Sequence, residues 1–310
     1  GFPESHSASF ALLVYISSWL KRHHPTAFYA GILNSQPMGF YSPSQLIQDA
    51  RRHDINVLPA CINRSLWEHS VDLTSHHNQP ALRLGLCLIK GICEESVKAA
   101  IESRRLNPFY SVNDVRQRGL FHADQLRKLI NADVFHQFES NRRRAYWHAL
   151  QCDDGFNTQE PSSAEFIQDL DALETLSADY QHARGVSLRY HPLQLLRDTK
   201  PFNRCVPAAQ LLSRRNNSMI EVAGVVTGRQ RPGTASGVMF MTLEDETGNI
   251  NVVLWKAVQE RFRQAVLTSS ILHVKGQLEH KNGVVHVVAG YIEQQDHALP
   301  ELRSRSRNFH

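Results

Sequence analysis

The sequence of 310 residues is long enough for about two domains. Its 42% hydrophobic and 21% charged residues are typical of a chain that buries a core. The longest apolar run, residues 10–16, falls far short of the roughly 20 residues of a membrane span, and no secretory leader opens the chain. Five cysteines without a C-x-x-C pair argue against a disulfide scaffold and a zinc ribbon. These features predict a cytoplasmic protein without a membrane partner.

Charge is uneven along the chain. Residues 151–183 hold eight acidic residues and no Lys or Arg, whereas the rest carries all 34 basic residues and 22 of the 30 acidic ones, a net charge of +12. A basic body suits a polyanionic partner, because phosphate contacts dominate nucleic-acid affinity. A solvated surface of mixed sign is the alternative. The chain begins with Gly1 rather than Met, which predicts a piece of something longer.

Residues 1–80 predict a helical unit that ends in a small β element. An almost wholly apolar pattern over residues 7–22 predicts a buried helix. Pro25 opens a second helix, and Ser42-Pro43 provides the cap and first-turn proline of a third. Short strands are expected over residues 57–58, 66–73 and 81–84.

Residues 81–150 predict short helices joined by tight turns. The turn Lys90-Gly91-Ile92-Cys93, before a helix over residues 94–103, has the pattern of a helix-hairpin-helix. In that motif, backbone N–H groups and the positive end of the following helix hold a DNA phosphate. Cys93 stands where a second glycine is usual, and its side chain hinders close approach, so a plain helical turn is the alternative. Lys90, Gly91 and Ile92 are the expected nucleic-acid contacts.

Three further segments complete the middle of the chain. The turn Asn131-Ala132-Asp133-Val134 has no glycine and is interpreted as packing. The run Arg142-Arg143-Arg144 either meets a DNA backbone or forms a solvated face. Residues 151–218 predict an acidic linker and connector helices, with a capping box at Ser162-Ser163-Ala164-Glu165 for a helix that reaches Tyr180.

Residues 219–295 predict a five-stranded OB barrel. Its one helix, over residues 256–266, falls between the third and fourth strands, as in that architecture. The expected strands are residues 219–227, 238–243, 250–255, 270–278 and 284–289. A basic tail, residues 296–310, follows and is expected to be disordered. The fold class is therefore multidomain α+β, with a helical portion, a helix-hairpin-helix unit and a carboxy-terminal OB barrel.

The predicted barrel carries four candidate nucleic-acid contacts. Arg229 and Arg231 are expected in the loop between strands one and two, and Lys281 in the loop between strands four and five. These two loops flank the oligonucleotide groove of such barrels. Trp255 lies on the strand face opposite Ile250, where it either stacks on a base or caps the barrel core. Phe240 has the same two interpretations.

The sequence shows no metal site or catalytic centre. The adjacent histidine pairs at 23–24 and 76–77 diverge on a helix and on a strand, without a Cys or acidic partner at ligand spacing. Asp169 and Asp171 point in different directions on a helix. No phosphate-binding glycine loop or nucleophile elbow is present. No cofactor is therefore expected in this chain.

Three long segments resemble bacterial C-family DNA polymerases. Residues 1–53 resemble the distal fingers, residues 82–105 (LRLGLCLIKGICEESVKAAIESRR) the helix-hairpin-helix, and residues 222–255 the OB domain. The segment NSQPMGFYSPSQLIQDARRH and the carboxy-terminal sequence RSRNFH resemble the error-prone branch (ImuC) more than the replicative subunit. The similarity covers nearly the whole chain in the family's order.

The resemblance implies template-directed DNA synthesis during damage-induced mutagenesis, with ImuA and ImuB as accessory proteins and Mg²⁺ for the full polymerase. The family's catalytic aspartates lie in a palm outside this chain. We therefore expect a carboxy-terminal portion, inactive alone, that holds primer-template and template single strand. Ser5-His6-Ser7 would face phosphate in the fingers or cap a helix. The alternative is a non-enzymatic single-strand-binding or scaffold protein built from the same domains.

Overall fold

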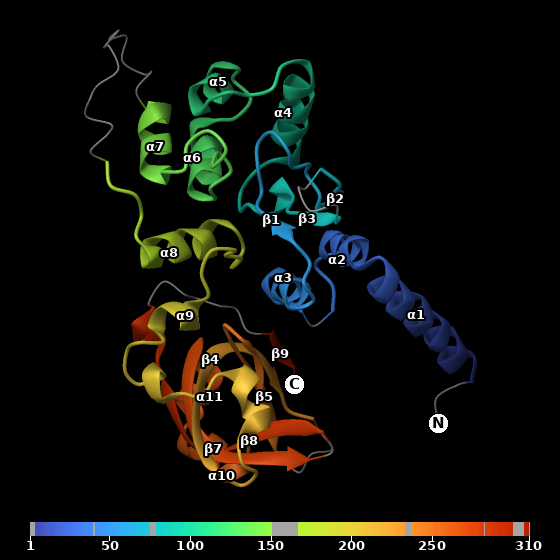
Figure 1. The fold of residues 1–310 in the computed structure, drawn as a ribbon, viewed down its shortest axis with the longest axis vertical. Helices are drawn as coiled ribbons and strands as arrows, with labels where there is room; N and C mark the ends of the chain where they lie inside the picture. The colour runs from blue at the N-terminus through green and yellow to red at the C-terminus, as the bar shows by residue number, and fades with distance from the viewer. Residues whose placement is uncertain are drawn as a thin grey trace. The chain divides into compact units, whose positions relative to one another are not determined.

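The computed structural model describes residues 4–39, 41–74, 79–150, 167–232, 237–281, 283–299 and 307–309. The chain divides into two compact units, Gly1–Leu188 and Arg189–His310. Each unit has its own hydrophobic core. The helices and strands of both units carry the labels of Figure 1.

Unit one begins with three helices, α1 (Glu4–His23), α2 (Pro25–Asn34) and α3 (Pro43–Arg52). Ser42 caps α3 and forms a capping box with Gln45, as the Ser-Pro sequence predicts. The prediction that the first helix is buried is wrong. Its apolar side chains lie in solvent, with exposed fractions from 39% to 69%: Phe10, Leu12, Leu13, Val14, Tyr15, Ile16, Trp19 and Leu20. An apolar sequence shows which side chains of a helix could be buried. Whether they are buried depends on another element that covers them.

A three-stranded sheet follows, with the order β1-β3-β2. Its strands are β1 (Val57–Leu58), β2 (Ser70–Asp72) and β3 (Ala81–Arg83). β2 is shorter than the predicted strand over residues 66–73. The carbonyls of Leu66 and Trp67 accept hydrogen bonds from Leu86 and Cys87 instead of from a neighbouring strand. The Arg83 guanidinium joins β3 to β2 through an ion pair with Asp72 at 2.9 Å.

The rest of unit one is helical. Its elements are η1 (Leu86–Leu88), α4 (Glu94–Leu106), α5 (Val112–Gln117), α6 (Ala123–Asn131), α7 (Arg142–Leu150) and α8 (Ala172–His182). One core runs through the unit, and its fully buried members include Tyr29, Ile47, Leu82, Leu86, Leu129 and Phe135. α8 starts at the Asp171 cap, which forms a capping box with Glu174. The predicted box at residues 162–165 lies outside the described residues, but residues 167–170 are not helical, so the predicted helix starts too early.

Unit two consists of short connector elements and a β-barrel. The connectors are α9 (Pro192–Leu196), η3 (Phe202–Arg204) and η4 (Ala208–Ser213). The barrel region comprises β4 (Met219–Gln230), β5 (Met239–Asp245), β6 (Gly248–Leu254), α10 (Lys256–Arg261), α11 (Arg263–Thr268), β7 (Ile271–Lys281) and β8 (Val284–Gln294). Two short elements follow, η5 (Asp296–Ala298) and β9 (Arg307–Phe309).

The barrel has the topology of an OB fold. The strands follow the order β5-β6-β8-β7-β4, and a pairing of β4 with β5 closes the ring. β6 and β8 run parallel, and the helices lie between β6 and β7 in the chain. Opposite the bulge in β8, a Cβ on Gly276 of β7 would lie 2.3 Å from the carbonyl oxygen of Val288, so only glycine fits. The predicted OB barrel and the multidomain α+β class are confirmed.

Two predictions at the barrel's edges are wrong. β4 extends to Gln230 rather than ending at Thr227, so Arg229 lies in a strand and pairs with Met241. The tail is not wholly disordered, because Arg307–Phe309 forms β9, which pairs in parallel with Gly228–Gln230. β4 therefore has neighbours on two sides where the sequence predicts a loop.

Candidate nucleic-acid interface

The predicted hairpin forms a tight turn in front of α4. Gly91 has a φ of +72°, in the left-handed region that favours glycine, and Ile92 packs against the core. The backbone N–H of Lys90 donates to the carbonyl of His182 at 2.9 Å, and its Nζ donates to the carbonyl of Tyr180 at 3.1 Å. Among the described residues, no acceptor faces the N–H groups of Gly91, Ile92 and Cys93. These three donors precede a helix of 13 residues, whose N-terminus favours a phosphate, while the Glu94 and Glu95 carboxylates of its first turn oppose one.

Lys128 is a second cation beside this hairpin, and the sequence analysis missed it. Its Nζ lies 3.4 Å from the carbonyl oxygen of Gly91 and 2.5 Å from Asp124. A Cβ on Gly91 would approach that Nζ to 2.8 Å. Lys128 belongs to α6, so only the fold brings it to the turn. The Asp124–Lys128 spacing of four residues is typical of any surface helix and carries no functional signal.

The second turn and the arginine run are structural. Asp133 has a φ of +60°, the backbone conformation that glycine provides in the first hairpin, and Val134 is fully buried. The buried Arg142 guanidinium lies 2.6 Å from Asp179 and 3.5 Å from Asp133. The packing interpretation of residues 131–134 is thus confirmed. Arg143 and Arg144 also form ion pairs, with Glu174 and Glu139 respectively, so the run is not a row of unpaired surface cations.

Arg229 lies inside unit two instead of on a binding loop. Its side chain is buried, with Nε donating to the carbonyl of Val266 at 2.6 Å and Nη2 to that of Ser269 at 2.5 Å. Burial lowers the pKa of the guanidinium, although Asp296 opposes this effect. Arg229 therefore joins β4 to the end of α11, and its guanidinium is not exposed for contact with a nucleic-acid strand.

An aromatic pair lies on the outer face of β5 and β6. Trp255 directly follows β6 and is 55% exposed, so the interpretation that it caps the core is wrong. Phe240 is 38% exposed and stands opposite Val253 in the β5–β6 register. Trp255 is thus its diagonal neighbour across the pair, at a spacing where two large side chains share one surface. Ile250, Val252 and Leu254 are buried inside the barrel. We call Phe240, Val253 and Trp255 the aromatic face.

Two exposed cations lie beyond opposite ends of this face. Arg231 comes directly after Gln230, which pairs with Phe240. Lys281 is the last residue of β7 and pairs with Val284, so it lies in a strand and not in the predicted loop. Two residues further along β8, His286 stands opposite Asn251 of β6. An exposed aromatic surface flanked by cations suits a single strand, whose bases stack while its phosphates are neutralised.

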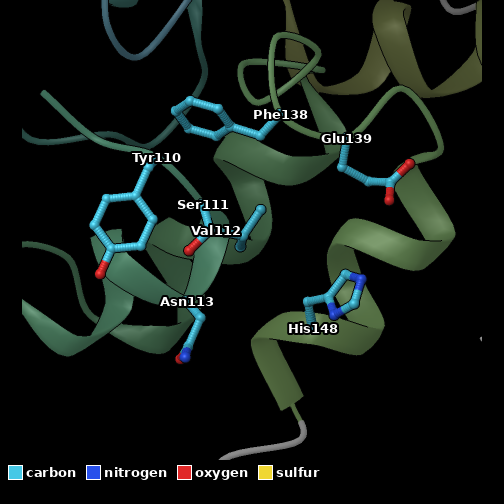
Figure 2. Close-up of a pocket in the computed structure, with 7 residues that line it drawn as sticks. All are labelled: Tyr110, Ser111, Val112, Asn113, Phe138, Glu139 and His148. Carbon is cyan, nitrogen blue, oxygen red and sulfur yellow. The ribbon is translucent and has the colours of Figure 1, made fainter. Parts of the chain in front are cut away.

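A hollow of about 230 Å³ lies in unit one, between the start of α5 and α7 (Figure 2). It is lined by Tyr110, Ser111, Val112, Asn113, Phe138, Glu139 and His148. Burial raises the pKa of Glu139, but hydrogen bonds from the Arg144 side chain and the Asn141 backbone outweigh burial and lower it. The described lining of the hollow includes no Lys or Arg, and its Glu139 carboxylate is paired with Arg144, so this lining offers no cation for a phosphate.

No group of three His, Cys, Asp or Glu side chains is arranged to hold a metal ion in the described parts of the chain. None of the described helices combines the length and the apolar character needed to cross a membrane.

The two domains define the chain as one with nucleic-acid-binding architecture. A family model described as a helix-hairpin-helix motif matches residues 54–145. A second, described as an OB-fold nucleic acid binding domain, matches residues 220–294. Both matches coincide with the elements described above. Among solved structures, an asparaginyl-tRNA synthetase from Pyrococcus horikoshii matches 29% of this chain and 22% of its own, at 22% identity and a TM-score of 0.26.

Similarity over the full chain is more specific. The chain is 46% identical over 326 residues to an error-prone DNA polymerase of Saccharophagus degradans and 48% identical over 324 residues to that of Teredinibacter turnerae. It is 46% identical over 313 residues to that of Vibrio campbellii. Each alignment covers 100% of this chain, but only 31%, 31% and 30% of those proteins. The predicted resemblance to error-prone DNA polymerases is confirmed, and the chain spans about a third of their length.

Proposed function

We propose that this chain is the DNA-holding, carboxy-terminal portion of an error-prone DNA polymerase that acts in damage-induced mutagenesis and translesion synthesis. The observation that supports this most is the similarity to such polymerases along 100% of the chain. The two domain families and the exposed aromatic face agree with a binding role. A bacterial DNA substrate implies a cytoplasmic location.

In this proposal the two domains hold different parts of the substrate. The hairpin at Lys90, Gly91 and Ile92, with Lys128 beside it, takes a backbone phosphate of the primer-template duplex. The aromatic face, with Arg231 and Lys281, takes the single-stranded template. Stacking on aromatic rings tolerates any base, as a polymerase that reads every template requires.

Nucleotide addition is proposed for the whole polymerase. Its palm would supply the catalytic aspartates and bind Mg²⁺, and ImuA and ImuB would be its accessory proteins. This chain would contribute affinity and position, so we expect it to bind DNA and add no nucleotides on its own.

The aromatic face provides the first test. Stacking of one base contributes about 1–3 kcal/mol, so Trp255→Ala should weaken binding of a labelled single strand by about fivefold to 150-fold. Fluorescence anisotropy of the full chain over a salt series measures this, and Trp147→Ala is the control, because Trp147 is an exposed tryptophan of unit one. If the Trp255→Ala variant and the unchanged chain bind the single strand equally well, the aromatic face is not part of the binding surface. Failure of the unchanged chain to bind any DNA would reject the proposal itself.

A further inference from the structure

A second basic surface lies in unit two, apart from the aromatic face. It is a groove of about 580 Å³ between the connector elements and the first residues of β4. Its polar or exposed lining residues are Arg204, Arg214, Arg215, Ser218, Met219, Glu221 and Lys275. We call this the connector groove. In the barrel order, β8 separates β7, which carries Lys275, from β6, which precedes Trp255.

The negative charge in the connector groove is already neutralised. The Glu221 carboxylate accepts from Lys275 Nζ at 3.0 Å and lies 2.9 Å from His273 Nε2. Burial raises the pKa of Glu221, but the hydrogen bonds from Lys275 and His273 outweigh burial and lower it. The charges of Glu221 and Lys275 therefore cancel, and the three arginines give the groove a net positive charge.

The arginines retain most of their donor capacity. Arg214 donates to the Gln210 side chain at 3.2 Å. Among the described residues, no acceptor or carboxylate partners the guanidiniums of Arg204 and Arg215, and both side chains are exposed. A guanidinium presents a planar fork of donors that matches two phosphate oxygens, so unpartnered arginines in a groove favour phosphate recognition.

The lining of the groove favours the backbone of a strand over its bases. Its apolar members are Val206, Met219 and Ile220, and no aromatic ring lines the groove within the described residues. Bases would find no aromatic ring to stack on among these residues, whereas phosphates would find several cations. A contact to phosphate and sugar carries no sequence information and serves to position the strand.

We propose that the connector groove binds the phosphodiester backbone of a nucleic-acid strand without contacting its bases. This inference rests on the proposed function, because it takes the ligand to be nucleic acid. The groove gives unit two a second contact surface. Its affinity for nucleic acid depends on the number of phosphates contacted and on the salt concentration, and not on base stacking.

The test compares an ordinary single strand with a base-free strand of abasic sugar phosphates of equal length, using the full chain. The variant Arg204→Ala with Arg215→Ala should reduce the slope of log K against log salt by about 1.4 for both strands, since each single-strand phosphate contact contributes about 0.7. Neither guanidinium takes part in a described contact, so the fold should persist, as thermal unfolding would verify. The control, Arg261→Ala with Arg263→Ala, removes the same charge from exposed positions on α10 and α11 that do not line the groove.

An unchanged slope for the base-free strand would overturn the connector-groove proposal, and so would an equal loss in the control variant. Polyglutamate of the same charge that binds as tightly as the base-free strand would also overturn it, because the groove would then attract any polyanion. The Trp255→Ala variant separates the two proposals. If it weakens binding of the ordinary strand while the groove variant leaves the base-free strand unaffected, the proposed function stands and the connector groove does not.

Discussion

Two arginines separated by one residue show how environment decides a side chain's role. Arg229 is buried in β4 with the carbonyls of Val266 and Ser269, and Arg231 is exposed just beyond the strand. The sequence predicts one loop for both arginines, since their residue type and charge are identical. The difference arises because β4 pairs with β5 as far as Gln230 and places Arg229 against carbonyls at the end of α11, contacts between segments that local sequence does not encode.

At the residue scale we therefore expect the two arginines to affect different measurements. Arg229→Ala should lower the free energy of unfolding of unit two by about 1–3 kcal/mol, because two carbonyl oxygens lose their donor inside the fold. Arg231→Ala should change stability by no more than about 0.5 kcal/mol, as is usual at the surface, and should weaken binding of a single strand. Urea unfolding and anisotropy measure the two effects. A stable Arg229→Ala variant with weakened DNA binding would reverse this assignment.

Elements were predictable where the pattern is local. Ser42-Pro43 starts α3 and five strands with their helix form the OB barrel, as their sequences indicate. Predictions were wrong where burial or strand pairing depends on a distant segment, as for the exposed α1 and the shortened β2. In the candidate site, the Gly91 turn was visible in the sequence, whereas Lys128 and the connector groove were not, because the fold assembles them from separate segments.

His69 illustrates how a buried group stabilises an element through its neutral form. It lies in the turn before β2, and its Nδ1 accepts from the backbone N–H of Gly85 at 3.2 Å. Burial lowers the pKa of His69 from 6.5 to about 4. The folded chain thus resists protonation at a pH where the unfolded chain accepts a proton, so stability is complete above about pH 6.5 and falls toward pH 4.

We expect unit one to lose about 3 kcal/mol of unfolding free energy between pH 6.5 and pH 4 through His69 alone, at about 1.4 kcal/mol per pKa unit. The matched variant is His69→Gln, which cannot titrate, while all carboxylates contribute equally in both chains. Urea unfolding at several pH values gives the difference. Parallel stability curves for the two chains would show that His69 is not the titrating group.

At the scale of the whole molecule, the proposed function places one DNA contact on each unit. Unit one carries the hairpin and unit two the aromatic face. If the hairpin holds duplex and the barrel holds single strand, one ligand that offers both makes the second contact intramolecular, which multiplies affinity without new contacts.

A primer-template with a single-stranded overhang should therefore bind about tenfold or more tightly than a blunt duplex or a single strand of the same length. Anisotropy competition at fixed salt measures the three affinities. Trp255→Ala should reduce the advantage of the overhang and leave the blunt duplex unaffected. Equal affinities for all three ligands would mean that the units do not engage one molecule together.

The exposed apolar side chains of α1 also affect how the solubility of the purified chain changes with temperature. Attraction between apolar surfaces weakens on cooling, because burying them is driven by the release of ordered water. Leu12, Leu13 and Tyr15 offer such surface on every molecule. Concentrated samples should therefore stay clear on ice and turn cloudy on warming, well below the temperature at which either unit melts.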